Sequence, residues 1–435
     1  MVFYRSNDFK PSIKNLEVQM DKNIPMIKIK QQFDDDYLED ISGEIRKEFY
    51  RIGLDKKIQP GMKIAITAGS RGIDRMTEIL RSIIEEVKKI KGEPFIVTSM
   101  GSHGGATAEG QQKVLEHYGI TEESMGVPIR ATMETVEIDH LENGLPVHFD
   151  KIAYQSDGVI AVNRVKVHTA FKGEIESGLH KILSVGLGNH RGASLVHYLG
   201  VKGLKHYMVE FAKVILKKAP IIGGFGILEN GYDRTLEIKG ARPEDFAQVD
   251  SELLTKCKKI LPRLPVDKVD LLVVQEMGKN ISGTGMDTNI VGGIKDSGDS
   301  AQPEIKKILV LDITEESEGN SVGIGIAHMI TENLYKKIDY KAMYTNAITA
   351  TFFDRARVPI VFPTEQEAIE AGLKAIWNLP GVPPRIIIIR NTLKLDEIYV
   401  SKAIWEEIKD SKKISSMSNW ENLQFDSSNE LVNKI

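Results

Sequence analysis

The sequence has little of several features that would place it in a special class. It contains one cysteine, Cys257, in 435 residues. One thiol cannot form an intrachain disulfide, a cysteine-based zinc site or a cysteine-ligated iron–sulfur cluster, and it fits a reducing compartment. No apolar run reaches the roughly 18 residues that a membrane-spanning helix needs. The first residues lack the apolar core of a signal peptide. We therefore expect a cytoplasmic protein with no membrane partner.

The chain also lacks an excess of charge of one sign. Its 57 basic and 61 acidic residues give a net charge of −4. Proteins that bind phosphate backbones usually carry a basic excess, so we expect no nucleic-acid partner. Hydrophobic residues make up 41% and charged residues 27%, which is typical of a globular protein. At roughly 150 residues per domain, the length predicts two to three folding units.

In the first half, short apolar runs alternate with stripes of helical spacing. Residues 63–67, 94–100 and 158–165 are β-rich and apolar, so we predict three strands. Between them, apolar residues recur every three or four positions over about 73–90, and a further helix is expected over about 107–117. Alternation of strand and helix predicts a parallel sheet with right-handed crossovers.

A second α/β pattern follows the stretch 261–265, which holds two prolines and favours a linker. Expected strands are 270–275, 307–313, 358–362 and 385–390, and expected helices of this second pattern lie near 327–337, 340–350 and 364–376. A helix near 203–217 belongs to the first half. The predicted fold class is α/β, with two α/β domains, mostly parallel sheets and an active-site cleft between the domains. The predicted division is 1–262, 268–410 and a polar tail, 411–435.

Three of the predicted strands run into glycine-bearing loops, each with one charged or titratable side chain. These side chains are Arg71, His103 and His168. Ligands of open α/β sheets bind outside the carboxyl ends of the strands, so neighbouring parallel strands would bring the three together. A guanidinium fits a carboxylate with two hydrogen bonds. Imidazoles exchange protons with hydroxyls near neutral pH.

Two other readings of the sequence remain open at this point. Glu176 and His180 are spaced to share a helix face, and with His168 and Glu174 they would suit a divalent-metal hydrolase or lyase. A non-catalytic protein that binds carboxylates would use Arg71 and Lys279. A dinucleotide loop is not indicated, because GLGNHRG (186–192) has the spacing GxGxxxG.

Five segments in order resemble the nickel-pincer lactate racemase family. They are AGSRG (68–72), MGSHGGATAEGQ (100–111), VNRVKVHTAF (162–171), ESGLHKILSVG (176–186) and GKNISGTGMD (278–287). The resemblance implies an isomerase: a racemase or epimerase that inverts C2 of a small 2-hydroxy acid by hydride transfer. The implied cofactor is a nickel pincer nucleotide joined covalently to a lysine. At positions 68 and 72 this chain has Ala68 and Gly72, where characterised members of the family carry other residues. A larger or more polar acid, such as a sugar acid or malate, fits the glycine loop at least as well as lactate.

The resemblance also implies a role for single residues. Lys181 would carry the cofactor, and His197, sixteen residues later, would ligate nickel, with His190 as an alternative ligand. The other implied roles are catalysis by His103 and His168, substrate binding by Arg71 and Lys279, and cofactor binding by Ser70 and Gly101. The sequence does not indicate an oligomeric state.

Overall fold

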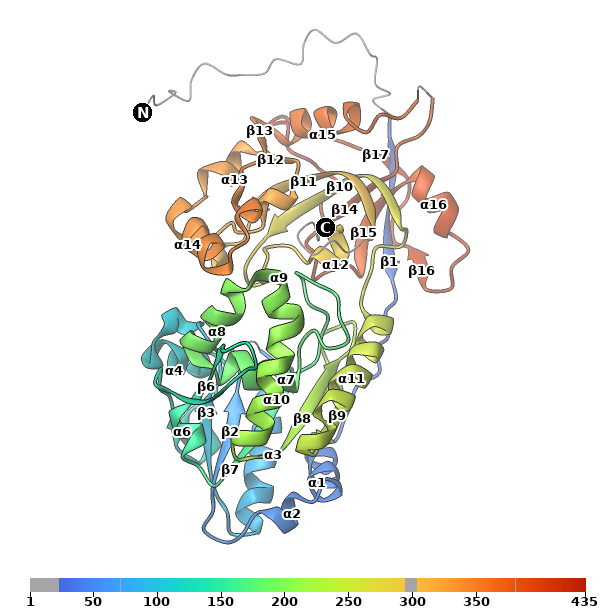
Figure 1. Ribbon diagram of the computed structural model, residues 1–435. Helices are drawn as coiled ribbons and strands as arrows, with labels where there is room; N and C mark the ends of the chain where they lie inside the picture. The colour runs from blue at the N-terminus through green and yellow to red at the C-terminus, as the bar shows by residue number, and fades with distance from the viewer. Residues whose placement is uncertain (1–22, 71, 294–302, 380) are drawn as a thin grey trace, which may run out of the picture.

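The computed structural model describes residues 23–70, 72–293, 303–379 and 381–435. The ribbon shows two lobes stacked end to end, with the first in blue to yellow-green and the second mostly in yellow to red (Figure 1). Each lobe is a β-sheet with helices packed against it. Two α/β domains were predicted, and this fold class is confirmed.

The first lobe contains a six-stranded sheet in the order β4-β3-β2-β7-β8-β9, counted over the described residues. The strands are β2 (Lys63–Ala68), β3 (Glu93–Thr98), β4 (Ile129–Arg130), β7 (Gly158–Arg164), β8 (Ile221–Glu229) and β9 (Thr235–Ala241), and a separate hairpin joins β5 (Thr135–His140) to β6 (Pro146–Asp150). All pairings in the sheet are parallel except β8 with β9. The strands form where the sequence is apolar and β-branched: five of the six residues of β2 are buried.

Helices cover both faces of this sheet. They are α1 (Ile41–Arg51), α2 (Leu54–Lys57), α3 (Met76–Lys89), η2 (Gly104–Ala106), α4 (Ala108–His117), α5 (Glu122–Met125), α6 (Lys151–Tyr154), α7 (Leu179–Lys181), η3 (Ile182–Gly186), α8 (Asn189–Tyr198), α9 (Gly200–Lys202), η4 (Gly203–Tyr207), α10 (Met208–Lys218), η5 (Pro243–Asp245) and α11 (Phe246–Ile260). The stripe expected over 73–90 is the buried face of α3, which packs Ile79, Ile83 and Val87 into the core beneath the sheet.

The second lobe is built on a nine-stranded sheet, again counted over the described residues. Its strands are β1 (Pro25–Gln31), β10 (Lys268–Met277), β11 (Glu304–Ile313), β12 (Met329–Thr331), β13 (Ile360–Phe362), β14 (Ile386–Ile389), β15 (Glu397–Ser401), β16 (Ile414–Ser416) and β17 (Glu421–Asn422). Strands β10 to β14 pair in parallel, whereas β15, β1, β16 and β17 pair antiparallel. This sheet is therefore mixed rather than mostly parallel.

The helices of the second lobe complete its layers. They are α12 (Thr288–Val291), η6 (Glu315–Ser317), η7 (Ile324–Ile326), α13 (Glu332–Lys336), α14 (Tyr340–Ala350), η8 (Phe353–Ala356), α15 (Glu365–Lys374) and α16 (Lys402–Ile408). The helix predicted near 327–337 is wrong over its first part, because Met329–Thr331 is a strand buried between β11 and β13. No helix in the described ranges is both long and apolar enough to cross a membrane.

Two segments lie elsewhere than the predicted division suggests. Residues 25–31 form β1, which pairs with β15, so the chain begins its described part in the second lobe. The polar tail also belongs to this lobe: Leu423 and Leu431 are buried in its core, and Glu365 of α15 accepts a hydrogen bond from the Leu431 amide. Both ends of the chain therefore help to cover one sheet.

Candidate active site

The three glycine-bearing loops leave the same edge of the first sheet. Strand β2 lies between β3 and β7 and is parallel to both, with Ala68 opposite Thr98. The loops that follow these strands carry Ser70, His103 and His168. The expected neighbourhood of the three strands is confirmed. Arg71 lies outside the described residues.

The short helix that carries Lys181 is positioned by a carboxylate on α11. Asp250 is fully buried and accepts hydrogen bonds from the amides of Leu179, at 2.8 Å, and His180, at 2.9 Å. It also accepts one from Nδ1 of His180, at 2.8 Å. Gly178 has φ +96°, and a Cβ there would collide with Asp250. The sequence SGLHK therefore needs glycine at 178, because the carboxylate that caps this turn fills the space.

The loop that carries His103 packs on the continuation of this helix. After Lys181 the helix widens into a π-helical turn, η3. Such turns are frequent at functional sites. The amide of Gly101 donates to the carbonyl of Gly186 at 3.1 Å, and Gly101 has φ +60°. A Cβ at Gly101 would lie 3.0 Å from the carbonyl oxygen of Val185. Glycine at 101 therefore lets the His103 loop approach the Lys181 helix closely.

The loop that carries His168 is held by several contacts. The amide of His168 donates to Oε2 of Glu176 at 2.8 Å, and Glu176 also forms an ion pair with Lys258. Nδ1 of His168 accepts from the amide of Ala170 at 3.1 Å. The ring lies 4.6 Å, between centroids, from that of Phe171. These contacts fix the orientation of the imidazole, as a catalytic or binding group requires.

The positive charge of Lys181 lowers the pKa of both His168 and His197. Burial lowers the pKa of His168 well below its usual range, and the positive charges of Lys181, Lys166 and Arg355 lower it further. Burial also lowers the pKa of His197 to about 4, again with contributions from Lys181 and Arg355. Both imidazoles are therefore neutral at pH 7, in one neighbourhood of positive charge.

His197 has a ring nitrogen that the protein does not satisfy. Its Nδ1 is buried and has no hydrogen-bond partner in the described part of the chain. A buried polar atom of this kind calls for an explanation, of which a bound group is one. By contrast, His190 is exposed at the start of α8, where Nδ1 lies 3.5 Å from Oγ of Ser194. Of the two histidines, His197 is thus the one suited to hold a metal.

The second lobe reaches the first at two places near these residues. Thr288 of α12 donates to the carbonyl of Thr169 at 2.6 Å, directly after His168. Between α14 and η8, Thr351 donates to the carbonyl of His197 at 3.3 Å. Lys279 is held in the loop after β10, where Nζ donates to the carbonyl of Gly283 at 2.7 Å. That bond does not join Lys279 to the first lobe.

Comparison with known proteins agrees with this architecture. Residues 10–202 match the family described as "Lactate racemase N-terminal domain". Over this stretch, which is less than half of its length, the chain is similar to the N-terminal domain of lactate racemases. It is similar in fold to the lactate racemase apoprotein from Thermoanaerobacterium thermosaccharolyticum, with a TM-score of 0.51 and 13% sequence identity over 85% of this chain and 98% of that one. No curated protein matches the chain.

Two side chains of the divalent-metal alternative, Glu176 and His180, have other partners in the structure. Residue 176 precedes α7, so Glu176 and His180 do not share a helix face. Glu176 pairs with Lys258, and His180 pairs with Asp250. No group of three or more histidine, cysteine, aspartate or glutamate side chains in the described ranges could hold a metal ion. The geometry does not support that alternative.

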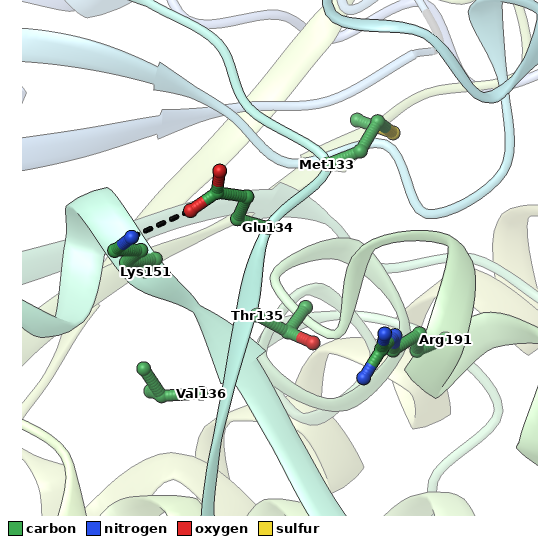
Figure 2. A pocket seen from close by; sticks show the side chains of 6 residues that line it. All are labelled: Met133, Glu134, Thr135, Val136, Lys151 and Arg191. Carbon is green, nitrogen blue, oxygen red and sulfur yellow. Dashed lines mark hydrogen bonds and ion pairs between the residues drawn. The ribbon is translucent and has the colours of Figure 1, made fainter.

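A separate hollow lies on the first lobe, beside the β5–β6 hairpin. Figure 2 shows its lining residues, and its volume is about 420 Å³. They are Met133, Glu134, Thr135, Val136, Lys151 and Arg191. Lys151 is paired with Glu134 at 2.6 Å. None of the predicted site residues lines this hollow, so it is distinct from the site.

Sequence reasoning missed two residues that shape the site. Asp250 lies about seventy positions after the turn that it caps, and no local motif connects the two. Arg355 comes from the second lobe, where its guanidinium stacks 4.0 Å from the ring centroid of Phe352. Its charge acts on both His168 and His197. In the sequence Arg355 directly follows Asp354, and no motif marks it.

Proposed function

We propose that this chain is a racemase or epimerase of a 2-hydroxy acid that uses a nickel pincer nucleotide on Lys181. One observation carries the proposal: His197, whose pKa the charge of Lys181 helps to lower, has a buried ring nitrogen with no partner among the described residues. Both residues fall in the part of the chain that matches the lactate racemase N-terminal domain. A lysine amine for attachment and an imidazole for the metal are the two protein groups that the cofactor needs.

The residues present fit the cofactor chemically. An imidazole must be neutral to bind a metal ion, and a pKa of about 4 keeps His197 neutral at pH 7. The only cysteine, Cys257, is buried in α11, so soft ligands for nickel would have to come from the cofactor itself. When bound, this cofactor supplies a hydride acceptor for C2 of the substrate. A chain with a single cysteine forms no intrachain disulfide, which agrees with the proposal of a cytoplasmic protein.

The other residues would bind and orient the hydroxy acid. Arg71 and Lys279 would hold the C1 carboxylate through charge-assisted hydrogen bonds. His103 and His168 would contact the C2 hydroxyl and handle its proton. Ser70 and Gly101, in the loops after β2 and β3, would line the binding site of the cofactor. Arg355 adds a positive charge from the second lobe, which would favour an anionic substrate.

The test is to produce the full chain with and without the enzymes that make the cofactor. With them, the protein should gain mass on Lys181 and about one nickel per chain, and it should interconvert the stereoisomers of at least one acid among lactate, malate and sugar acids. Lys181→Ala should abolish the mass gain. His197→Ala should keep the mass gain but lose nickel.

His190→Ala is the matched control, because His190 is exposed on the same helix as His197. It should retain both the mass gain and the nickel. An unchanged nickel content in both Lys181→Ala and His197→Ala would contradict the proposal. Stabilisation by hydroxy acids without any turnover would indicate a carboxylate-binding protein instead.

A further inference from the structure

The two proposed catalytic histidines bind the backbone in opposite senses. Nδ1 of His103 lies 2.9 Å from the carbonyl oxygen of Met100. A carbonyl can only accept, so Nδ1 of His103 carries a hydrogen. Nδ1 of His168 lies 3.1 Å from the amide nitrogen of Ala170. An amide N–H can only donate, so Nδ1 of His168 carries a lone pair.

These partners assign different tautomers to the two rings. A neutral imidazole has one N–H, and the other nitrogen is an acceptor. In neutral His103 the hydrogen is on Nδ1, so Nε2 is the basic nitrogen. In neutral His168 the hydrogen is on Nε2, which is therefore a donor. The hydrogen bond at one ring nitrogen thus sets what the other can do.

The surroundings of His168 oppose any change in its state. Its loop is held by Glu176, by Phe171 and by the bond from Thr288 to the neighbouring carbonyl. A second hydrogen on Nδ1 would face the Ala170 N–H and break that bond. Burial and nearby positive charge also lower the pKa of this ring. His103 is exposed, so an imidazolium there would be hydrated.

We infer that His168 serves as a neutral hydrogen-bond donor to the C2 oxygen of the substrate, and that His103 alone exchanges the hydroxyl proton. The inference rests on the proposed function. In the oxidising step, the O–H bond breaks and its proton moves to Nε2 of His103. The cofactor, when bound, would supply the acceptor for the hydride that C2 loses, and C2 and oxygen would become a carbonyl. Nε2–H of His168 stabilises the developing charge on that oxygen and keeps its own proton. The two histidines are then unequal partners.

The tautomers can be measured without the cofactor. Full-length protein with ¹⁵N-labelled histidine would be examined by two-bond ¹H–¹⁵N correlation spectra at neutral pH, with His103→Gln and His168→Gln to assign the signals. We expect a protonated Nδ1 in His103 and a protonated Nε2 in His168. The same tautomer in both rings, or protonation of His168 near neutral pH, would overturn the inference.

Kinetics of the cofactor-loaded enzyme give an independent readout. Glutamine places an amide N–H₂ near the position of Nε2 but cannot exchange a proton. His168→Gln should therefore lower kcat by about tenfold or less, whereas His103→Gln should lower it by about 10²–10⁴-fold. His168→Leu, which has no donor, should lose more than His168→Gln.

The outcomes separate the inference from the proposed function. Equal losses in the two glutamine variants would refute the unequal roles while leaving the racemase intact. A wild-type chain that carries the cofactor but turns over no hydroxy acid would refute the proposed function, even if the tautomers are as expected.

Discussion

The carboxylate of Asp250 occupies the space that a side chain on Gly178 would need. The carboxylate can cap the turn at Leu179 and His180 because residue 178 has no Cβ. The position of Lys181, one turn later, therefore depends on a glycine and an aspartate that are far apart in the sequence. Replacing Gly178 tests this dependence through the stability of the folded protein.

Gly178→Ala should lower the free energy of unfolding by roughly 2–4 kcal/mol, because it combines a positive φ with a collision. Urea denaturation measures this value. Gly61→Ala is the matched control: its φ is +82°, but nothing lies within 4 Å of the added Cβ. The control should lose roughly 1 kcal/mol. Equal losses would show that Asp250 does not restrict residue 178.

Asp150 should make stability depend on pH in an unusual direction. Burial raises the pKa of Asp150 from 3.8 to about 6. The folded protein therefore holds this proton more tightly than the unfolded chain. The resulting stabilisation is complete below about pH 4 and is lost as the pH rises through 6. Asp150→Asn removes the effect, so the unfolding free energy of wild type relative to the variant should fall by up to about 3 kcal/mol between pH 4 and 7. Urea denaturation across this range checks the prediction, and a constant difference would contradict it.

Thr288→Val should loosen the His168 loop. The variant removes the hydrogen bond from the second lobe to the carbonyl of Thr169, which is worth about 1 kcal/mol. We expect faster hydrogen exchange of the amides in 168–172, measured by mass spectrometry. Thr349→Val is the control, because its hydroxyl donates to a carbonyl on the exposed face of α14. Unchanged exchange in Thr288→Val would show that the hydrogen bond from Thr288 does not hold this loop.

Arg355→Gln should raise the pKa of both His168 and His197, because it removes a positive charge that acts on each. The pKa of His197 should stay below its usual 6.5, since burial is the largest cause of its shift. NMR titration measures both values. Arg357→Gln is the control, because Arg357 is exposed and paired with Asp354. Equal shifts in the two variants would argue against a specific role for Arg355.

The sequence predicted the parts of the fold that depend on local patterns. The strands at 63–67, 158–165 and 307–313 and the helix at 340–350 were all found, because their apolar residues follow the period of the element. The segment 329–331 was assigned to a helix although it is a strand, because three residues are too few to show a period. The hairpin β5–β6 was missed, since no residue of β5 is buried and its sequence shows no apolar run.

The site was predictable in part. The glycine-bearing loops pointed to His103 and His168, because strand ends in parallel sheets are where ligands bind. The unsatisfied nitrogen of His197 and the opposite hydrogen bonds of the two imidazoles depend on tertiary contacts, so the sequence could not show them. The same holds for Arg355, which approaches from the other lobe.

Strand β1 has a consequence for how the chain folds during synthesis. Met26 pairs with Ser401, so β1 leaves the ribosome long before its partner is made. At 5–20 residues per second this delay is on the order of tens of seconds. Throughout that time Ile27 and Ile29, which end up buried, have no sheet to join. Because β1 and β15 come from opposite ends of the chain, we expect neither half, expressed as a separate contiguous fragment, to form a complete second lobe.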